Sequence, residues 1–167
     1  MSHTYTLALD PGNTETGWAF IHNTTRQPLE FDKTANDDLL HQIVTDQLGL
    51  ANTHIAIEMV ASYGMPVGRE VFETCVWIGR FQQAMTDITG TVPTLVYRRD
   101  VKLHHCHSAK AKDSNIRQAL VDRFAPGAPN YGKGTKADPG WFHGFRADMW
   151  QAYALAVQQA DVLEGRF

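Results

Sequence analysis

Two short apolar stretches of the chain each end in an acid. Residues 7–9 read Leu-Ala-Leu and are followed by Asp10, and residues 55–57 read Ile-Ala-Ile and are followed by Glu58. Both stretches are typical of buried β-strands, whose side chains alternate between the two faces of a sheet. Each acid therefore shares a face with the Ala two residues before it. If the strands are parallel neighbours, both acids lie at carboxyl ends, where open α/β sheets place their ligand sites.

A pair of carboxylates in one place calls for a cation. Two ionised carboxylates repel and raise one another's pKa unless a cation lies between them. Ligation by oxygen alone favours a hard ion such as Mg²⁺ or Mn²⁺. Asp148 is the candidate third acid, because its neighbours Ala147 and Met149 are small or apolar. Taken alone, Asp148 is better explained as a helix cap or a solvent-facing residue than as a metal ligand. Three acids that each end or interrupt an apolar stretch nevertheless favour a metal site.

The elements that position these acids can be predicted from hydrophobic spacing and turn residues. Asn36 and Asp37 are expected to cap the first helix, and Gly49 to end it. The order of the expected strands and helices along the chain predicts an α/β fold. In it, an antiparallel half built from hairpins precedes parallel strands, in one mixed sheet flanked by helices on both faces. Expected strands cover residues 5–10, 16–21, 29–34, 54–59 and 94–97; expected helices cover residues 36–48, 69–88, 114–124 and 145–163, with a Gly- and Pro-rich loop over 126–144.

The composition is that of a globular protein. The chain has 167 residues, of which 43% are hydrophobic and 20% charged. No apolar run approaches the length of a membrane span, and the first residues lack the character of a signal peptide. Cys75 and Cys106 lie far apart, which argues against a disulfide framework. We expect a single domain over residues 1–167, located in a reducing cytoplasm and not in a membrane.

Positive charge is concentrated in one part of the chain. The formal net charge is −3, yet residues 98–136 carry nine basic and three acidic side chains. A concentrated basic segment can bind phosphate groups even on an acidic protein. From charge alone, a nucleic-acid surface and a solvated face explain the segment equally well.

Several motifs together resemble a known family. Residues 10–17 (DPGNTETG), the IEMV around Glu58, the basic stretch 101–120 (VKLHHCHSAKAKDSNIRQAL) and residues 147–157 (ADMWQAYALAV) occur in the order found in RuvC-type Holliday-junction resolvases. These enzymes are members of the ribonuclease H-like superfamily. The stretch GMPVGREVFET, with GRF after it, is most similar to the phage-type branch. The resemblance spans nearly the whole chain and implies the ribonuclease H-like fold.

The resemblance also implies an activity. The chain would be a Mg²⁺-dependent endonuclease that acts as a homodimer on branched DNA such as four-way junctions, in recombination and repair, within a bacterial or phage-infected cell. Asp10, Glu58 and Asp148 would be its catalytic residues and would hold two metal ions, with Mn²⁺ able to replace Mg²⁺. The family usually has a fourth carboxylate one helical turn after the third, where this chain has Gln151. Which of the family's two acidic positions Asp148 serves therefore stays open.

Further residues are assigned to nucleic-acid binding. Tyr63, five residues after Glu58, could stack on a base unpaired at the crossover, or could pack on the start of the helix after it. Lys133 and Lys136 lie in the Gly-rich loop, where they suit phosphate contact or solubility. The complete basic set is Arg69, Lys102, Lys110, Lys112, Arg117, Lys133 and Lys136.

Other classes of protein share parts of these patterns. A nucleotide-binding fold of the actin and sugar-kinase type has a similar Asp-x-Gly hairpin, but needs a second such hairpin and a second domain. A ribosomal-RNA-processing nuclease of the same superfamily, or a junction-binding protein without activity, are nearer alternatives. A zinc site at residues 104–107 (HHCH) is disfavoured, because adjacent residues of an extended segment point in opposite directions and no second ligand pair follows at zinc spacing. A half-exposed strand end, or polar contacts near DNA, explain that segment better.

Overall fold

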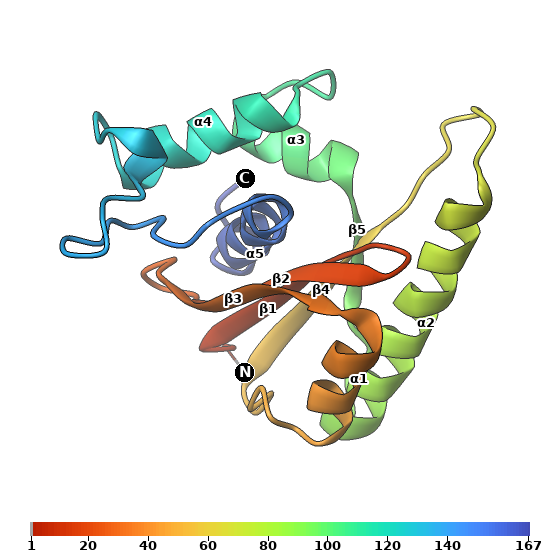
Figure 1. Cartoon of the computed structure of the whole chain (residues 1–167). Helices are drawn as coiled ribbons and strands as arrows, with labels where there is room; N and C mark the ends of the chain where they lie inside the picture. Colours follow the sequence, from red (N-terminus) through yellow and green to blue (C-terminus); the bar gives the residue numbers. More distant parts are fainter. Residues whose placement is uncertain (1) are drawn as a thin grey trace.

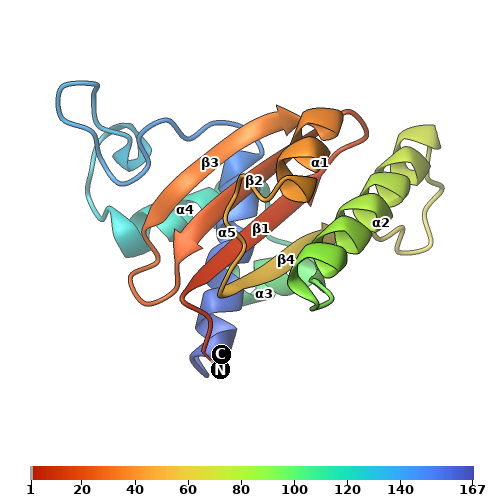
Figure 2. The ribbon, with the colours of Figure 1, turned by 90° about the horizontal axis from the view of Figure 1, so that it is seen from below.

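The computed structural model describes residues 2–167, which form one five-stranded sheet between two layers of helices (Figures 1 and 2). The elements are β1 (Tyr5–Pro11), β2 (Glu15–His22), β3 (Pro28–Ala35), α1 (Asn36–Val44), β4 (Thr53–Met59), α2 (Arg69–Thr89), β5 (Thr94–Tyr97), α3 (Arg98–Cys106), α4 (Asp113–Phe124), the short 3₁₀ helix η1 (Asn130–Gly132) and α5 (Met149–Leu163).

The sheet combines an antiparallel half with a parallel half. Its strand order is β3-β2-β1-β4-β5. Strands β1 and β2, and β2 and β3, pair antiparallel, whereas β1 with β4 and β4 with β5 pair parallel. This is the mixed sheet that the order of elements predicts. Within the described residues, no helix is both long and apolar enough to cross a membrane.

The alternation of side chains in the central strands divides the core in two. Leu7 and Leu9 pack with α1 and α2 on one face, whereas Ala8 and Ala56 face α5 on the other. The small Ala side chains allow α5 to lie close against the sheet. Helix α5 is buried from Met149 to Asp161, because the sheet lies beneath it and α3 and α4 cover it from above (Figure 1).

The first helix differs from its prediction at both ends. It stops at Val44 rather than near residue 48, and Asp46 has a positive φ of 50° in the turn that follows. Asn36 is not the cap, since the residue before the helix is Ala35. Instead, the Asn36 side chain donates to the Gly12 carbonyl (2.9 Å) and accepts from the Thr16 hydroxyl (2.6 Å). It ties the β1–β2 hairpin to α1.

Residues 98–106 form a helix, α3, that the sequence pattern does not predict. The interpretation of residues 104–107 as an extended segment is therefore wrong. His104 Nε2 lies 2.8 Å from an Asp161 carboxylate oxygen, and His105 Nε2 donates to the Ala154 carbonyl at 2.8 Å. Both rings thus hold α3 against α5, and His107 ends the helix with a positive φ of 56°.

Helix α5 begins later than predicted. The sequence pattern predicts helix from residue 145 onward, but Ala147 adopts a left-handed φ of 42°, which interrupts the helix before Met149. Asp148 is consequently the residue that precedes α5, and not a residue within it. Aromatic residues support the start of α5, since Phe142 and Phe145 pack on Trp150.

A buried ion cluster fixes the other end of α5. Asp161 accepts from the Arg26 guanidinium (2.8 and 3.0 Å) and from Arg123 (2.6 and 2.9 Å), in addition to His104. Arg26 also pairs with Glu164 at 2.8 Å. The side chains of Arg26 and Asp161 are only 2% and 3% exposed. This cluster joins the β2–β3 turn, α3, α4 and α5.

Candidate active site

Asp10 and Glu58 lie side by side at the carboxyl ends of the two central parallel strands. The register pairs Ala8 with Ala56 and Leu9 with Ile57, so that Asp10 of β1 and Glu58 of β4 come next along the same pair of strands. Both side chains are only 14% exposed. The alternation pattern predicts this arrangement, and the parallel register produces it.

A single guanidinium group lies among the acids. The Nε atom of Arg98 is 3.1 Å from Glu58 Oε1, its Nη2 is 3.7 Å from Asp10 Oδ2, and its Nη1 is 3.5 Å from Asp113 Oδ2. Arg98 is the first residue of α3 and follows directly after β5, the parallel neighbour of β4. The edge of the sheet that carries the acids therefore also delivers this cation to them.

Burial makes negative charge costly at this place. The pKa of Asp10 is raised well above its ordinary value, chiefly by burial and then by the neighbouring Glu58 carboxylate. Burial also raises the pKa of Glu58, and in both residues Arg98 opposes the rise. A pair of carboxylates in this state gains from any cation that enters between them.

Asp148 reaches the same region from the start of α5. Gly17 is the β2 residue opposite Asp10, and an added Cβ on Gly17 would lie 2.7 Å from the Asp148 Cβ. The glycine therefore creates the space in which Asp148 packs against the sheet. The Asp148 carboxylate is 2.8 Å from Lys33 Nζ, and its charge contributes to the raised pKa of Asp10. Lys33 lies opposite Gly17 on β3, in line with Asp10.

Substitution of Gly17 by Ala tests this close packing. The added methyl group would overlap both the side chain and the backbone of Asp148, so α5 or the strand must shift. We expect a loss of about 1–3 kcal/mol in the free energy of unfolding and reduced function of the site. Urea denaturation measures the first effect, with Gly68→Ala, where an added Cβ meets nothing within 4 Å, as the control. Equal stability of Gly17→Ala and the unmodified chain would contradict this account.

Gln151 lies one turn after Asp148, on α5. It is buried, with 7% exposure. Asp113, at the start of α4, is an acid that the sequence motifs do not single out. It shares the Arg98 guanidinium with Asp10 and Glu58 and is half exposed at the edge of the site.

The donor set fits a hard divalent cation, and Arg98 and Lys33 compensate only part of its negative charge. In their present conformations, no three His, Cys, Asp or Glu side chains within residues 2–167 are arranged as a metal site. Asp10 and Glu58 nevertheless offer buried carboxylate oxygens with too little compensating charge, which is the chemistry that Mg²⁺ or Mn²⁺ satisfies. Asp10, Glu58 and Asp148 are the residues that would hold such ions.

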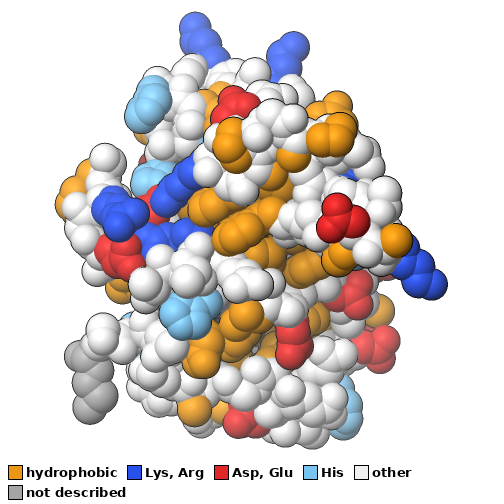
Figure 3. Space-filling view, turned by 90° about the vertical axis from the view of Figure 1, so that its left-hand side faces the viewer, with side chains coloured by type: hydrophobic (Ala, Val, Ile, Leu, Met, Phe, Trp, Pro, Cys, Tyr) orange, Lys and Arg blue, Asp and Glu red, His pale blue; other side chains and the backbone are white. Residues whose placement is uncertain are grey.

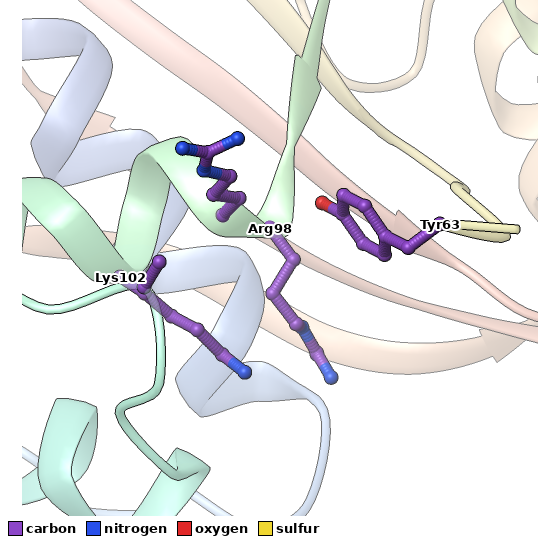
Figure 4. Close-up of a pocket in the computed structure, with 5 residues that line it drawn as sticks. Tyr63, Arg98 and Lys102 are labelled. Atoms are coloured by element: carbon purple, nitrogen blue, oxygen red, sulfur yellow. The ribbon is translucent and has the colours of Figure 1, made fainter.

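Next to the acids lies a pocket with basic and aromatic walls. It is lined by Tyr63, Arg98, Arg99, Lys102 and Ala109. Figure 4 shows Arg98 between Tyr63, from the β4–α2 loop, and Lys102, from α3. Tyr63 is 68% exposed, so it does not pack on the start of α2. The Tyr63 ring and the Lys102 ammonium group, which lie on either side of Arg98, could contact a base and a phosphate.

The remaining basic residues are distributed differently. Lys110 and Lys112 are exposed between α3 and α4, whereas the Arg117 guanidinium is partly buried near the rings of Tyr131 (5.3 Å) and Trp150 (5.7 Å). Arg69 is exposed at the start of α2 and forms an ion pair with Glu73.

The loop that carries Lys133 and Lys136 lies on the opposite side of the molecule from the Tyr63 loop (Figures 1 and 2). Figure 3 looks onto that side and shows hydrophobic side chains at its centre, with Lys and Arg side chains both beside them and at the rim. The structure therefore places Tyr63 and Lys102 in the pocket with Arg98, which contacts the acids, but it does not place the basic residues of this loop there.

Sequence reasoning missed Arg98, Lys33 and Asp113. A signal for Arg98 was present, because it follows the last parallel strand just as the acids end the two before it. Lys33 could be found only with the β2–β3 register, which places it opposite Gly17.

The comparisons with known proteins identify the fold. No family model and no curated protein matches the chain in sequence. Among solved structures, the chain is similar to Thermus thermophilus RuvC in complex with Holliday junction substrate, with a TM-score of 0.68 and 12% identity over 98% of this chain and 96% of that chain. A second Thermus thermophilus RuvC structure has the same TM-score and identity, with 97% of each chain covered.

The mixed sheet with its flanking helices is therefore a ribonuclease H-like fold. More narrowly, it is the RuvC type of that fold, as the motifs predict.

Proposed function

We propose that the protein is a metal-dependent, structure-selective endonuclease that cleaves four-way junctions and other branched DNA. One observation carries the proposal: in a RuvC-type fold, Asp10 and Glu58 meet at the carboxyl ends of adjacent parallel strands, with Asp148 packed beside them over Gly17. One of the similar structures is a complex of RuvC with Holliday junction substrate, which supports the choice of substrate.

The chain's own residues have distinct roles in this proposal. Two bound Mg²⁺ or Mn²⁺ ions would supply nucleophile activation and leaving-group stabilisation for phosphodiester hydrolysis. Asp10, Glu58 and Asp148 hold the ions, and burial of the first two keeps water from screening their charge. Lys102 neutralises a phosphate beside the cleaved bond, and Tyr63 stacks on a base that the crossover leaves unpaired.

A homodimer fits this substrate, because a junction has two strands to be cut in symmetrical positions. Helix α2 offers a surface for pairing. Phe72 and Val76 are 63% and 62% exposed and stand one turn apart, and Gly79 follows on the same side with open space around it. Exposed apolar side chains next to a glycine allow two such helices to approach closely.

A substrate panel tests the proposed function against its nearest alternative. A labelled four-way junction, a linear duplex of one arm and a structured RNA are each incubated with the protein and Mg²⁺. We expect cleavage of the junction, and little cleavage of the others. Preferential cleavage of the RNA would favour a ribosomal-RNA-processing nuclease, and binding without any cleavage would favour an inactive junction-binding protein.

Salt dependence tests the contact between lysine and phosphate. Removing one contacting lysine, as in Lys102→Met or Lys112→Met, should weaken binding to all branched DNAs alike. It should also reduce the slope of log K against log salt by about 0.9, because one fewer counterion is released. Fluorescence anisotropy from low to moderate salt measures the slope, with Arg166→Gln at the far end of the chain as the control. Unchanged slopes in both lysine variants would show that these side chains do not contact phosphate and belong to a solvated face.

The exposed Tyr63 ring gives a separate prediction. Stacking on a base is worth about 1–3 kcal/mol, so Tyr63→Ala should reduce processing of the junction by roughly 5- to 150-fold. Tyr63→Phe keeps the ring and should retain most activity. Single-turnover cleavage rates of the three proteins measure the effect. Equal losses in both variants would show that the hydroxyl, and not the ring, is needed.

A further inference from the structure

The Arg98 guanidinium is the only cation that contacts both buried acids in the described part of the chain. Its three nitrogens each face a different carboxylate, at 3.1 Å from Glu58, 3.7 Å from Asp10 and 3.5 Å from Asp113. Glu58 and Asp10 are mostly buried and Asp113 is half exposed, with exposures of 14%, 14% and 51%. The guanidinium therefore lies where the acids create the most favourable position for positive charge.

The backbone holds Arg98 at this place, while its side chain stays movable. Arg98 directly follows Tyr97, which pairs with Met59 at the end of β4, so its Cα is fixed by the sheet. The side chain is 35% exposed and faces the pocket that also contains Tyr63 and Lys102. An outward movement would leave the two buried acids while keeping Asp113 and the pocket within reach.

We propose that Arg98 is an internal counter-ion of the acid pair and competes with divalent metal for Asp10 and Glu58. This inference rests on the proposed function, since it concerns the metal that the nuclease would use. Without metal, the guanidinium relieves the repulsion between the carboxylates. When metal binds, the guanidinium moves away from Asp10 and Glu58, toward Asp113 and the pocket beside Tyr63, where DNA phosphate would be a new partner.

Charge explains why the Arg98 guanidinium and a divalent metal ion can replace one another at Asp10 and Glu58. One guanidinium charge compensates two buried carboxylates incompletely, whereas a divalent ion compensates both. The metal must nevertheless displace a cation that already occupies the favourable position, so Arg98 lowers the apparent affinity. Lys33 is a different case, because its ammonium group contacts Asp148 and Glu15 rather than the buried pair.

Binding of Mn²⁺ in the absence of DNA tests the proposal directly. Free Mn²⁺ is followed by electron paramagnetic resonance during titration of the unmodified chain and of Arg98→Gln, Arg98→Lys and Arg166→Gln. We expect Arg98→Gln to bind Mn²⁺ at least about tenfold more tightly, because the competing charge is gone. Arg98→Lys should stay close to the unmodified chain, and Arg166→Gln, which removes a charge far from the site, should not differ from it.

Thermal unfolding adds a readout that does not depend on catalysis. In EDTA, Arg98→Gln should unfold at a lower temperature than the unmodified chain, since the buried carboxylates have lost their counter-ion. Excess Mn²⁺ should raise its melting temperature by more than it raises that of the unmodified chain. Arg166→Gln should behave like the unmodified chain in both conditions.

The possible results separate this inference from the proposed function. If the unmodified chain binds Mn²⁺, loses it in Asp10→Asn, and Arg98→Gln binds no more tightly, the inference is wrong while the metal site stands. Weaker binding of Mn²⁺ by Arg98→Gln would also overturn the inference, because it would show that Arg98 helps the site to bind metal. If neither the unmodified chain nor Arg98→Gln binds Mn²⁺ at millimolar concentration, both the inference and the metal-dependent function fail.

Discussion

Asp10→Asn should reduce cleavage of a four-way junction by roughly 10³-fold or more, while binding to the junction stays close to that of the unmodified chain. The substitution keeps the shape of the side chain and removes one charge that would hold metal. A bound metal ion contributes several kcal/mol to stabilisation of the transition state, and each 1.36 kcal/mol corresponds to about a factor of ten in rate. Single-turnover cleavage and a gel-shift assay in EDTA measure the two quantities.

The same variant should be at least as stable as the unmodified chain when metal is absent. The pKa of Asp10 is raised in the folded protein, so the folded state favours the protonated carboxyl. A raised pKa contributes stability at low pH, and that contribution is lost as pH rises through the folded value. Asn cannot ionise, so Asp10→Asn does not suffer this loss of stability at neutral pH. Asp122→Asn, which alters an exposed acid on α4, is the control for the stability measurement. Cleavage by Asp10→Asn near the unmodified rate would refute the assignment of the site.

Asp161→Asn should cause a large loss of stability. Asp161 accepts hydrogen bonds from Arg26, Arg123 and His104, and its side chain is 3% exposed. Loss of its charge leaves the buried Arg26 with only the Glu164 carboxylate as a charged partner. Removing one partner of a buried ion pair costs about 3–5 kcal/mol. Urea denaturation at neutral pH measures the difference.

The control for this prediction is Glu164→Gln, which removes the more exposed partner of Arg26, 31% exposed, and should cost about 1 kcal/mol or less. The pKa of Asp161 is held well below its usual range by its basic partners, against the effect of burial. Its contribution to stability is therefore present at neutral pH and is lost as pH falls through the folded value. The gap in stability between the unmodified chain and Asp161→Asn should narrow in acid. A loss no larger than that of Glu164→Gln would contradict this role.

The elements with strong hydrophobic patterns were predictable from the sequence. The central strands, α2 and α4 follow from alternation or helical spacing, and together they give the mixed sheet and its order. Helix α3 could not be recognised in this way, because the stretch RRDVKLHHC is largely polar and buries only Val101. Contacts of His104 and His105 with residues of α5, which lie 57 and 49 positions further along the chain, hold it in place.

The candidate site was predictable to the extent that one edge of the sheet defines it. Asp10 and Glu58 were paired by strand alternation and parallel register alone. Arg98 was not assigned to them, because its charge was counted with a basic segment that a nucleic-acid surface and a solvated face explain equally well. That segment in fact serves several purposes: Lys102 lines the pocket beside the acids, whereas Arg123 and His104 belong to the buried Asp161 cluster. Sequence spacing gives the charge of each residue, but only the tertiary structure shows its partner.

The most direct test of the proposed function is cleavage of one labelled four-way junction under three conditions: the unmodified chain with Mg²⁺, the unmodified chain with EDTA, and Asp10→Asn with Mg²⁺. We expect symmetrical cuts near the crossover in the first reaction and intact junction in the other two, with the linear duplex of the same sequence left uncut throughout. Cleavage that persists in EDTA or in Asp10→Asn, or a junction that stays intact with Mg²⁺ although the protein binds it, would contradict a metal-dependent nuclease centred on Asp10 and Glu58.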